Sequence, residues 1–158
     1  MRIILTLAII LLPFGLTTTA QDNRIDTLKA EVTQKVEDNK KMVQEIVDSL
    51  FSYSELGFQE YETQRYIGDL LEKNEFNVEK GVAGLPSGWW ATWGSGHPVI
   101  ALGTDVDGIP KASQKPGVAY KDPLIEGAPG HGEGHNSGMA VIITAALALQ
   151  DVMKRDII

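Results

Sequence analysis

A chain of 158 residues is long enough for one domain with a sizeable core, and this one carries 21 acidic against 14 basic side chains, a formal net charge of −7 at pH 7. An acidic chain without a basic cluster excludes nucleic acid and an anionic membrane surface as expected partners. Cysteine is absent, which excludes disulfides, thiolate metal ligands and a lipid anchor on cysteine. A small molecule or a metal ion remains as the expected class of partner.

The first 20 residues have the features of a secretory signal peptide. Arg2 precedes an apolar run over residues 3–16, and the small residues of the sequence TTA follow. The run is short for a helix that spans a membrane. We therefore predict a cleaved signal over residues 1–20 and a periplasmic or secreted protein that has no membrane anchor after cleavage. An uncleaved N-terminal anchor is the alternative.

The next part of the chain has helical periodicity. Between residues 22 and 51, apolar residues recur at helical spacing among charged and polar ones, which predicts one amphipathic helix or two. The sequence SYSELGF interrupts the pattern, with Gly57 at a turn. A further helix is expected over residues 61–74, where a second apolar stripe follows.

The spacing of the apolar residues changes from helical to strand-like after residue 75. Three segments are β-branched or aromatic and bounded by Gly and Pro, which predicts strands over residues 76–84, 88–94 and 98–108. The run from Val99 to Leu102 is continuously apolar, as in a strand that is covered on both faces.

A long loop and a last helix complete the order. Residues 108–134 are rich in Gly and Pro, and loops of this length in a compact domain are usually functional. Residues 139–153 are apolar nearly all round, which predicts a buried helix with Asn136 or Ser137 as its N-cap. Together the elements predict an α/β domain in which helices cover a sheet.

The sequence GTDVDGIP is the first that could carry chemistry. Asp105 and Asp107 follow the predicted buried strand, at the carboxyl end where open α/β sheets present their ligands. In an extended chain, residues two apart face the same way. A turn in which these aspartates accept hydrogen bonds from backbone N–H groups is the alternative.

The sequence GAPGHGEGHNSG is the second. In an extended chain His131, Glu133 and His135 would project to one side, and the glycines between them would let the backbone approach a bound ion. Imidazole and carboxylate groups are ordinary zinc ligands. The spacing differs from the H-E-x-x-H of zinc proteases, so that mechanism does not transfer. A flexible surface turn is the alternative, but the position before a helix N-terminus favours bound anions and carboxylates.

These segments, taken in order, resemble a known family. SELGFQEYET, GVAGLPSGWWATWGSGHPVIALGTDVDGIP and GAPGHGEGHNSGMAVIITAAL are similar to the amidohydrolase branch of the dimetal carboxypeptidase and aminoacylase metallopeptidases, above all to its aminobenzoyl-glutamate hydrolases. The resemblance covers about residues 30–155. It implies a three-layer α/β/α catalytic domain of the zinc-peptidase type, interrupted by a smaller dimerisation domain. It also implies hydrolysis of an amide bond by a water that one or two divalent metals hold.

The resemblance also assigns site residues. His135 falls on a metal-ligand histidine, and Glu133 falls where this branch usually has a ligand Cys. Asp107 matches a catalytic-site aspartate that orients metal or ligand. Asp105 matches a position where dizinc relatives carry a ligand His and this branch an acidic or other group. Because a carboxylate is a harder ligand than a thiolate, the implied divalent metal is zinc or manganese.

Part of the family's site falls beyond the last predicted helix. The general-base Glu, its neighbouring ligand Glu, the further His or Asp ligands and the dimerisation domain all belong there. The resemblance therefore implies that residues 21–158 are the N-terminal part of an exported enzyme for a small-molecule N-acyl amino acid or peptide-like substrate. The part alone is expected to be inactive, and a homodimer is expected only for a full-length form. The alternative is a non-catalytic remnant or binding module that keeps the fold.

Overall fold

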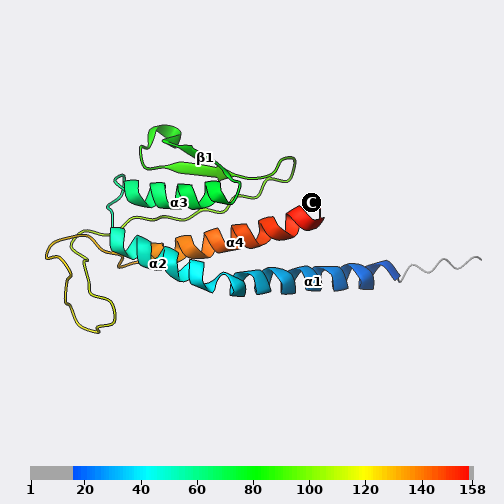
Figure 1. The fold of residues 1–158 in the computed structure, drawn as a ribbon, viewed down its shortest axis with the longest axis horizontal. Helices are drawn as coiled ribbons and strands as arrows, with labels where there is room; N and C mark the ends of the chain where they lie inside the picture. The colour runs from blue at the N-terminus through cyan, green and yellow to red at the C-terminus, as the bar shows by residue number, and fades with distance from the viewer. Residues whose placement is uncertain (1–15, 157–158) are drawn as a thin grey trace, which may run out of the picture.

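The computed structural model describes residues 16–156, so the apolar run of the predicted signal peptide lies, apart from Leu16, outside the described residues. Figure 1 shows the arrangement of the helices and strands. In chain order they are α1 (Leu16–Asp38), α2 (Lys40–Tyr53), α3 (Tyr61–Lys73), β1 (Asn77–Lys80), a short 3-10 turn η1 (Val82–Gly84), β2 (Trp89–Thr92) and α4 (His135–Asp156).

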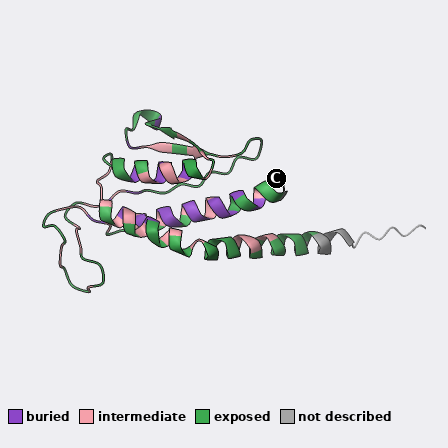
Figure 2. Cartoon of the chain, in the orientation of Figure 1, coloured by how far each residue is buried: buried purple, intermediate pink, exposed green. Residues whose placement is uncertain are grey.

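Helices α2 and α4 pack together and form the centre of the core. The region predicted as one helix or two is two helices, α1 and α2, and Asn39 lies between them. Ile46 and Leu50 of α2 are fully buried, and Ile143 and Leu147 of α4 keep only 4% and 7% of their surface exposed. The two helices contact each other, and Figure 2 shows buried residues along α4. Burial of apolar side chains on this scale is the main source of folding free energy.

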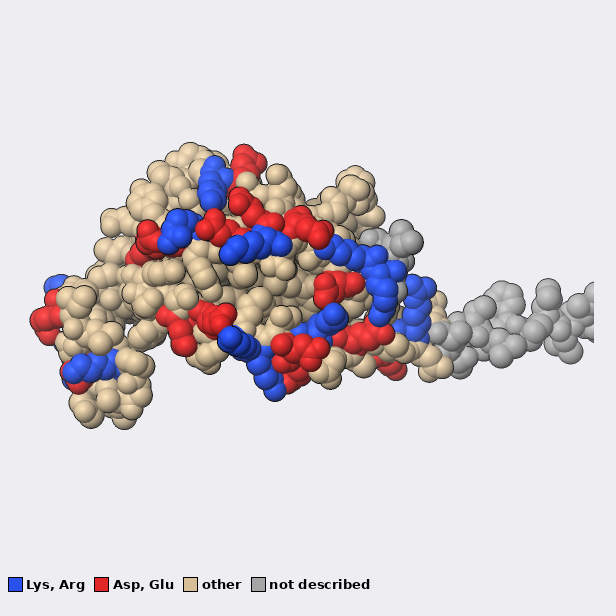
Figure 3. All heavy atoms as spheres, in the orientation of Figure 1, with Lys and Arg blue, Asp and Glu red and all other residues tan. Residues whose placement is uncertain are grey.

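Helix α1 lies along α4, and two ion pairs join the two helices. Lys35 lies 2.9 Å from Asp151, and Arg155 pairs with Glu31. Basic and acidic side chains are interspersed over the face in Figure 3. Because these pairs are half exposed, each contributes little to stability. The core, and not the ion pairs, therefore fixes the fold.

Helix α3 covers one face of a small antiparallel sheet. Strands β1 and β2 pair in the register Asn77 to Thr92 and Lys80 to Trp89. Ile67 of α3 is fully buried, and Trp89 packs against the same core. The first two predicted strands are therefore confirmed, though both are shorter than predicted.

The third predicted strand is wrong for the described residues. Residues 98–107 form no strand and make no backbone-to-backbone hydrogen bond within the described part of the chain, and Val99 and Ile100 are 77% and 78% exposed. An apolar run becomes a strand only when a neighbour pairs its N–H and C=O groups, and no such neighbour lies among residues 16–156. The described residues thus form four α-helices and a two-stranded antiparallel sheet, not clearly a three-layer α/β/α domain.

Helix α4 begins earlier than predicted and is buried on one side. It starts at His135, so Asn136 and Ser137 lie inside its first turn and neither is the N-cap. Val141 is 65% exposed, so the helix is not buried all round. By length and composition α4 could cross a membrane, but half of its most apolar window is buried in the protein, and core helices pass the same test.

Candidate functional site

The central contact of the site joins two segments that lie 28 residues apart in sequence. Nδ1 of His135 lies 2.9 Å from Oδ1 of Asp107 and 3.3 Å from the backbone oxygen of the same residue. An ionised carboxylate only accepts hydrogen bonds, so Nδ1 is the donor. The other ring nitrogen, Nε2, lies 3.3 Å from Oε2 of Glu133. Asp107 and Glu133 therefore flank one imidazole ring from opposite sides.

Backbone hydrogen bonds hold the Asp107 segment in place. The N–H of Gly108 donates to the carbonyl of Glu55 at 2.6 Å, which ties this segment to the turn between α2 and α3. Ile109 and Gly130 exchange both of their backbone hydrogen bonds, at 2.9 and 3.1 Å. Asp107 is thus fixed on one side to the α2–α3 turn and on the other to the loop that carries His135.

The glycines of residues 130–136, which we call the histidine loop and which include the first two residues of α4, lie close to neighbouring chain. A Cβ atom on Gly130 would lie 2.2 Å from the carbonyl oxygen of Ala112, and one on Gly132 would lie 2.8 Å from Cδ1 of Ile109. The first distance is far shorter than a real contact of a Cβ atom and its neighbour is backbone, whereas the second meets the end of the Ile109 side chain, which can move. Gly130 is therefore required because the neighbouring chain comes close, whether or not an ion is bound.

The surroundings of His135 favour its charged form. Partial burial lowers the pKa of His135, but the hydrogen bonds to Asp107 and the charges of Asp107 and Glu133 together outweigh burial and raise the pKa above the ordinary value for histidine. In the charged ring, the hydrogen on Nε2 points toward the Glu133 carboxylate, on the side where Nε2 and Glu133 approach each other.

His131 does not join this pair. Its Nε2 lies 2.9 Å from the carbonyl oxygen of Leu50 in α2. Its Nδ1 is buried without a hydrogen-bond partner among the described residues. Burial is the largest influence on this ring and lowers the pKa of His131. The expectation that His131, Glu133 and His135 all project to one side is therefore wrong, because the loop is not extended and His131 turns toward α2.

Asp105 also lies apart from the others. Its side chain is exposed and makes no hydrogen bond or ion pair within the part of the chain that the structure describes, whereas Val106 beside it is buried. The structure thus brings Asp107, Glu133 and His135 together and leaves Asp105 outside the group.

The donor set fits a divalent metal in part. Glu133 and His135 offer an oxygen and a nitrogen that approach each other, both of types that zinc and manganese accept. A carboxylate on the far ring nitrogen, as Asp107 provides, is the usual way in which a metal-ligating histidine is oriented. Within residues 16–156, however, no group of three His, Asp or Glu side chains could hold an ion. The described residues supply two donors, and a protein zinc site uses three or four.

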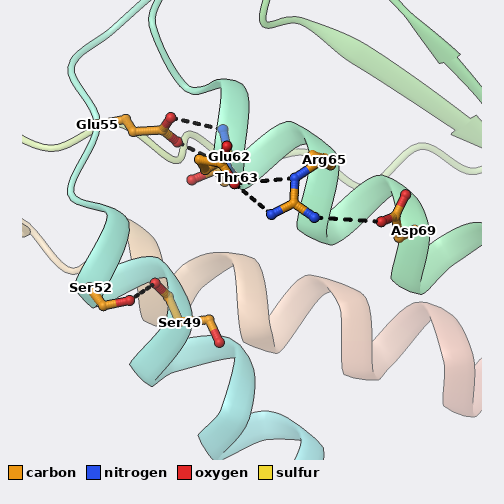
Figure 4. A network of polar contacts seen from close by, with 7 residues as sticks. All are labelled: Ser49, Ser52, Glu55, Glu62, Thr63, Arg65 and Asp69. Atoms are coloured by element: carbon orange, nitrogen blue, oxygen red, sulfur yellow. Dashed lines mark hydrogen bonds and ion pairs between the residues drawn. The ribbon is translucent and has the colours of Figure 1, made fainter.

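Sequence reasoning missed the part that Glu55 plays. Its two carboxylate oxygens accept the backbone N–H groups of Glu62 and Thr63, at 2.8 and 2.9 Å, and so satisfy the first turn of α3 (Figure 4). Capping rules examine the residues next to a helix start, and Glu55 lies six residues before Tyr61. No sequence signal at that distance predicts the contact.

One comparison with known proteins gives a match. Over 119 residues the chain is 29% identical to one of the subunits of the p-aminobenzoyl-glutamate hydrolase of Escherichia coli (strain K12). The match covers 75% of this chain and 25% of that protein, so the chain spans about a quarter of the length of this relative. No protein-family model and no solved structure matches the sequence. The chain therefore has a distant, partial homology to a hydrolase that acts on an amide bond, and the relation holds at family level only.

Proposed function

We propose that this chain provides one side of the metal site of an exported amidohydrolase that cleaves an N-acyl or peptide amide bond. The observation that carries the proposal is the arrangement of Asp107, His135 and Glu133, in which one imidazole lies between two carboxylates. The distant homology to a p-aminobenzoyl-glutamate hydrolase supports the reaction class.

Each of the three residues has a distinct part in the proposal. Asp107 holds the hydrogen on Nδ1 of His135, which leaves the lone pair of Nε2 for a cation once the Nε2 proton has left. Glu133 adds a negative charge on the same side of the ring. A divalent ion, zinc or manganese, would supply Lewis-acid activation of water and of the amide carbonyl when bound. Asp107 is thus the orienting residue, and Glu133 and His135 are the ligands.

The proposal requires groups outside the described residues. A third metal ligand and a general base are needed for hydrolysis, and residues 16–156 offer no third ligand at this site. We infer that they come from the rest of a longer polypeptide. A small-molecule N-acyl amino acid or peptide-like substrate, a periplasmic or secreted location and a homodimer of the full-length form belong to the same proposal.

The exposed segment before Asp107 supports a larger sheet in that longer polypeptide. Val99 and Ile100 lie in solvent, and residues 98–107 make no backbone-to-backbone hydrogen bond within the described part of the chain. Exposed apolar side chains are unfavourable in water, and backbone groups free of a protein partner are a template on which another strand can pair. We infer that this segment is a strand of an α/β/α domain when neighbouring strands are present.

Metal binding tests the proposal directly. Calorimetric titration of the purified protein with Zn²⁺ and with Mn²⁺ is expected to give weak binding that His135→Ala abolishes and Glu133→Gln weakens. His97→Ala is the matched control, because His97 is an exposed histidine outside the group of Asp107, Glu133 and His135. Retention of full binding by His135→Ala would contradict the proposal. In a longer form that supplies the missing groups, hydrolysis of p-aminobenzoyl-glutamate and other N-acyl amino acids should depend on His135.

The incomplete donor set also favours a second candidate function. A chain with two donors and a Glu in place of the usual Cys fits a binding module or remnant that keeps the fold without catalysis. Genomic sequence beyond codon 158 separates the two. An in-frame continuation with a Glu-Glu pair favours the enzyme, and a stop with no adjacent frame favours the remnant.

A further inference from the structure

Two polar side chains at the ends of the histidine loop bind the same helix. Nε2 of His131 lies 2.9 Å from the carbonyl oxygen of Leu50, and Nδ2 of Asn136 lies 3.2 Å from that of Val47. The two carbonyls lie three residues apart in α2 and thus on one face of the helix. Glu133 and His135 lie between these two attachment points in sequence. The loop is therefore held to α2 on both sides of the candidate ligands.

The contact with Leu50 fixes the ring of His131 in one state. A carbonyl oxygen only accepts hydrogen bonds, so Nε2 carries a hydrogen, and in the neutral ring Nδ1 is left with a lone pair. That Nδ1 is buried and has no partner among the described residues. An unpaired buried acceptor costs free energy, and the hydrogen bond at Nε2 offsets part of that cost.

A free lone pair on Nδ1 could also suggest a metal ligand, and the packing argues against this. On either side of His131 the glycines contact neighbouring chain closely, since a Cβ on Gly130 or Gly132 would overlap Ala112 or Ile109. Nδ1 is itself buried, so within the described residues its lone pair points into packed protein.

We propose that His131 is a positioning residue, which through Nε2 and together with Asn136 holds the loop on α2 so that His135 meets Asp107 and Glu133. The functional importance of this positioning rests on the proposed metal site, but the positioning itself is a property of the metal-free protein. The carbonyl of Leu50 also accepts the N–H of Ser54 at 3.0 Å, so the loop is attached where α2 ends and the turn toward Glu55 begins. The same turn holds Gly108 beside Asp107. His131 thus links both segments of the site to one fixed point.

Nitrogen NMR of the histidine rings tests the proposal without any metal. The chain has three histidines, so the ring signals are few and can be assigned by replacement. We expect His131 to be in the Nε2–H form at neutral pH, with an unprotonated Nδ1, and the Nδ1 proton of His135 to be visible and slowly exchanging because Asp107 holds it. Finding His131 in the Nδ1–H form would overturn the proposal.

Two replacements of His131 separate positioning from simple packing. His131→Gln places an amide donor at a reach similar to Nε2, whereas His131→Leu fills space without a donor. We expect the Leu variant to lose the Nδ1 proton signal of His135 and to melt at a temperature several degrees lower, and the Gln variant to restore the signal. Equal loss of the signal in both variants, or in neither, would refute positioning by the hydrogen bond. If the Leu variant fails to fold, the Gln variant and the ring state of the unmodified protein still decide.

Titration with Zn²⁺ alone keeps this proposal distinct from the proposed function. We expect Zn²⁺ to shift the Nε2 signal of His135 and to leave the Nδ1 signal of His131 in place. A large shift of His131 Nδ1 would make it a ligand and overturn the positioning role. If Zn²⁺ shifts the nitrogen signals of neither ring, the proposal of a metal site in this chain is wrong. The ring state of His131 and the pair of replacements then still support positioning.

Discussion

Oδ1 of Asp107 lies 2.9 Å from Nδ1 of His135, which joins the end of an extended segment to the first residue of α4. The contact both orients the ring and stabilises its charged form.

Replacing Asp107 by Asn should lower the pKa of His135. The amide oxygen of Asn still accepts a hydrogen bond from Nδ1, but the negative charge that helps to raise the pKa of His135 is gone. Titration of the ring signals by NMR in the metal-free protein measures the shift. Asp105→Asn is the matched control, because Asp105 is exposed and has no partner within the described residues. An unchanged pKa of His135 in Asp107→Asn, or an equal fall in both variants, would contradict this account.

The two loop histidines should give the protein opposite pH dependences. Burial lowers the pKa of His131, so it contributes stability above its unfolded value of about 6.5, and that contribution is lost as the pH falls through the lower folded value. The pKa of His135 is lowered by burial but raised overall by Asp107 and Glu133, so its contribution is present below about 6.5 and is lost as the pH rises through the raised folded value.

Urea unfolding between about pH 5 and 8 tests this in the metal-free protein. The free energy of unfolding should fall less on acidification in His131→Gln than in the unmodified protein. In His135→Gln it should fall less as the pH rises. Identical pH profiles for the two variants and the unmodified protein would show that neither ring couples to folding.

Loss of the Glu55 carboxylate should weaken the start of α3. Two backbone N–H groups in the first turn would lose a charged acceptor in Glu55→Ala, and loss of a helix cap costs about 1 to 2 kcal/mol in free energy of unfolding. Glu62→Ala is the control, since its side chain makes only an exposed ion pair with Arg65 and its loss should cost clearly less. Denaturant unfolding of both variants gives the comparison, and equal costs would be evidence against the cap.

The helices could be predicted from the sequence because their determinants are local. Apolar spacing gave α3 to within a residue and separated it from the α1 and α2 region. The strand expected at Val99 to Leu102 could not be decided locally, because pairing depends on a neighbouring strand that the periodicity of one segment does not reveal.

The candidate site was predictable in part for the same reason. Sequence singled out Asp107, Glu133 and His135, which the fold brings together, but it could not foresee that Asp105 stays in solvent. It also could not foresee that His131 turns to Leu50, since that contact joins residues 81 apart in sequence. Contacts of side chains with distant backbone groups depend on packing, and the spacing of residues in the sequence does not determine packing.

Gly130 gives the sharpest test of how the two segments of the site fit together. A Cβ atom there would lie 2.2 Å from the carbonyl oxygen of Ala112, and Gly130 also exchanges two backbone hydrogen bonds with Ile109. Gly130→Ala must therefore push the loops apart, and we expect it to lower the free energy of unfolding by about 1 to 3 kcal/mol, as overpacking does. Gly103→Ala is the matched control, because nothing lies within 4 Å of a Cβ at that position, and it should change stability by less than about 0.5 kcal/mol.

The displacement of the loops in Gly130→Ala should also move His135 away from Asp107. The Nδ1 proton signal of His135 should therefore disappear in Gly130→Ala and persist in Gly103→Ala. Equal stability of the two variants, with both signals intact, would mean that the aspartate segment and the histidine loop are not packed as described.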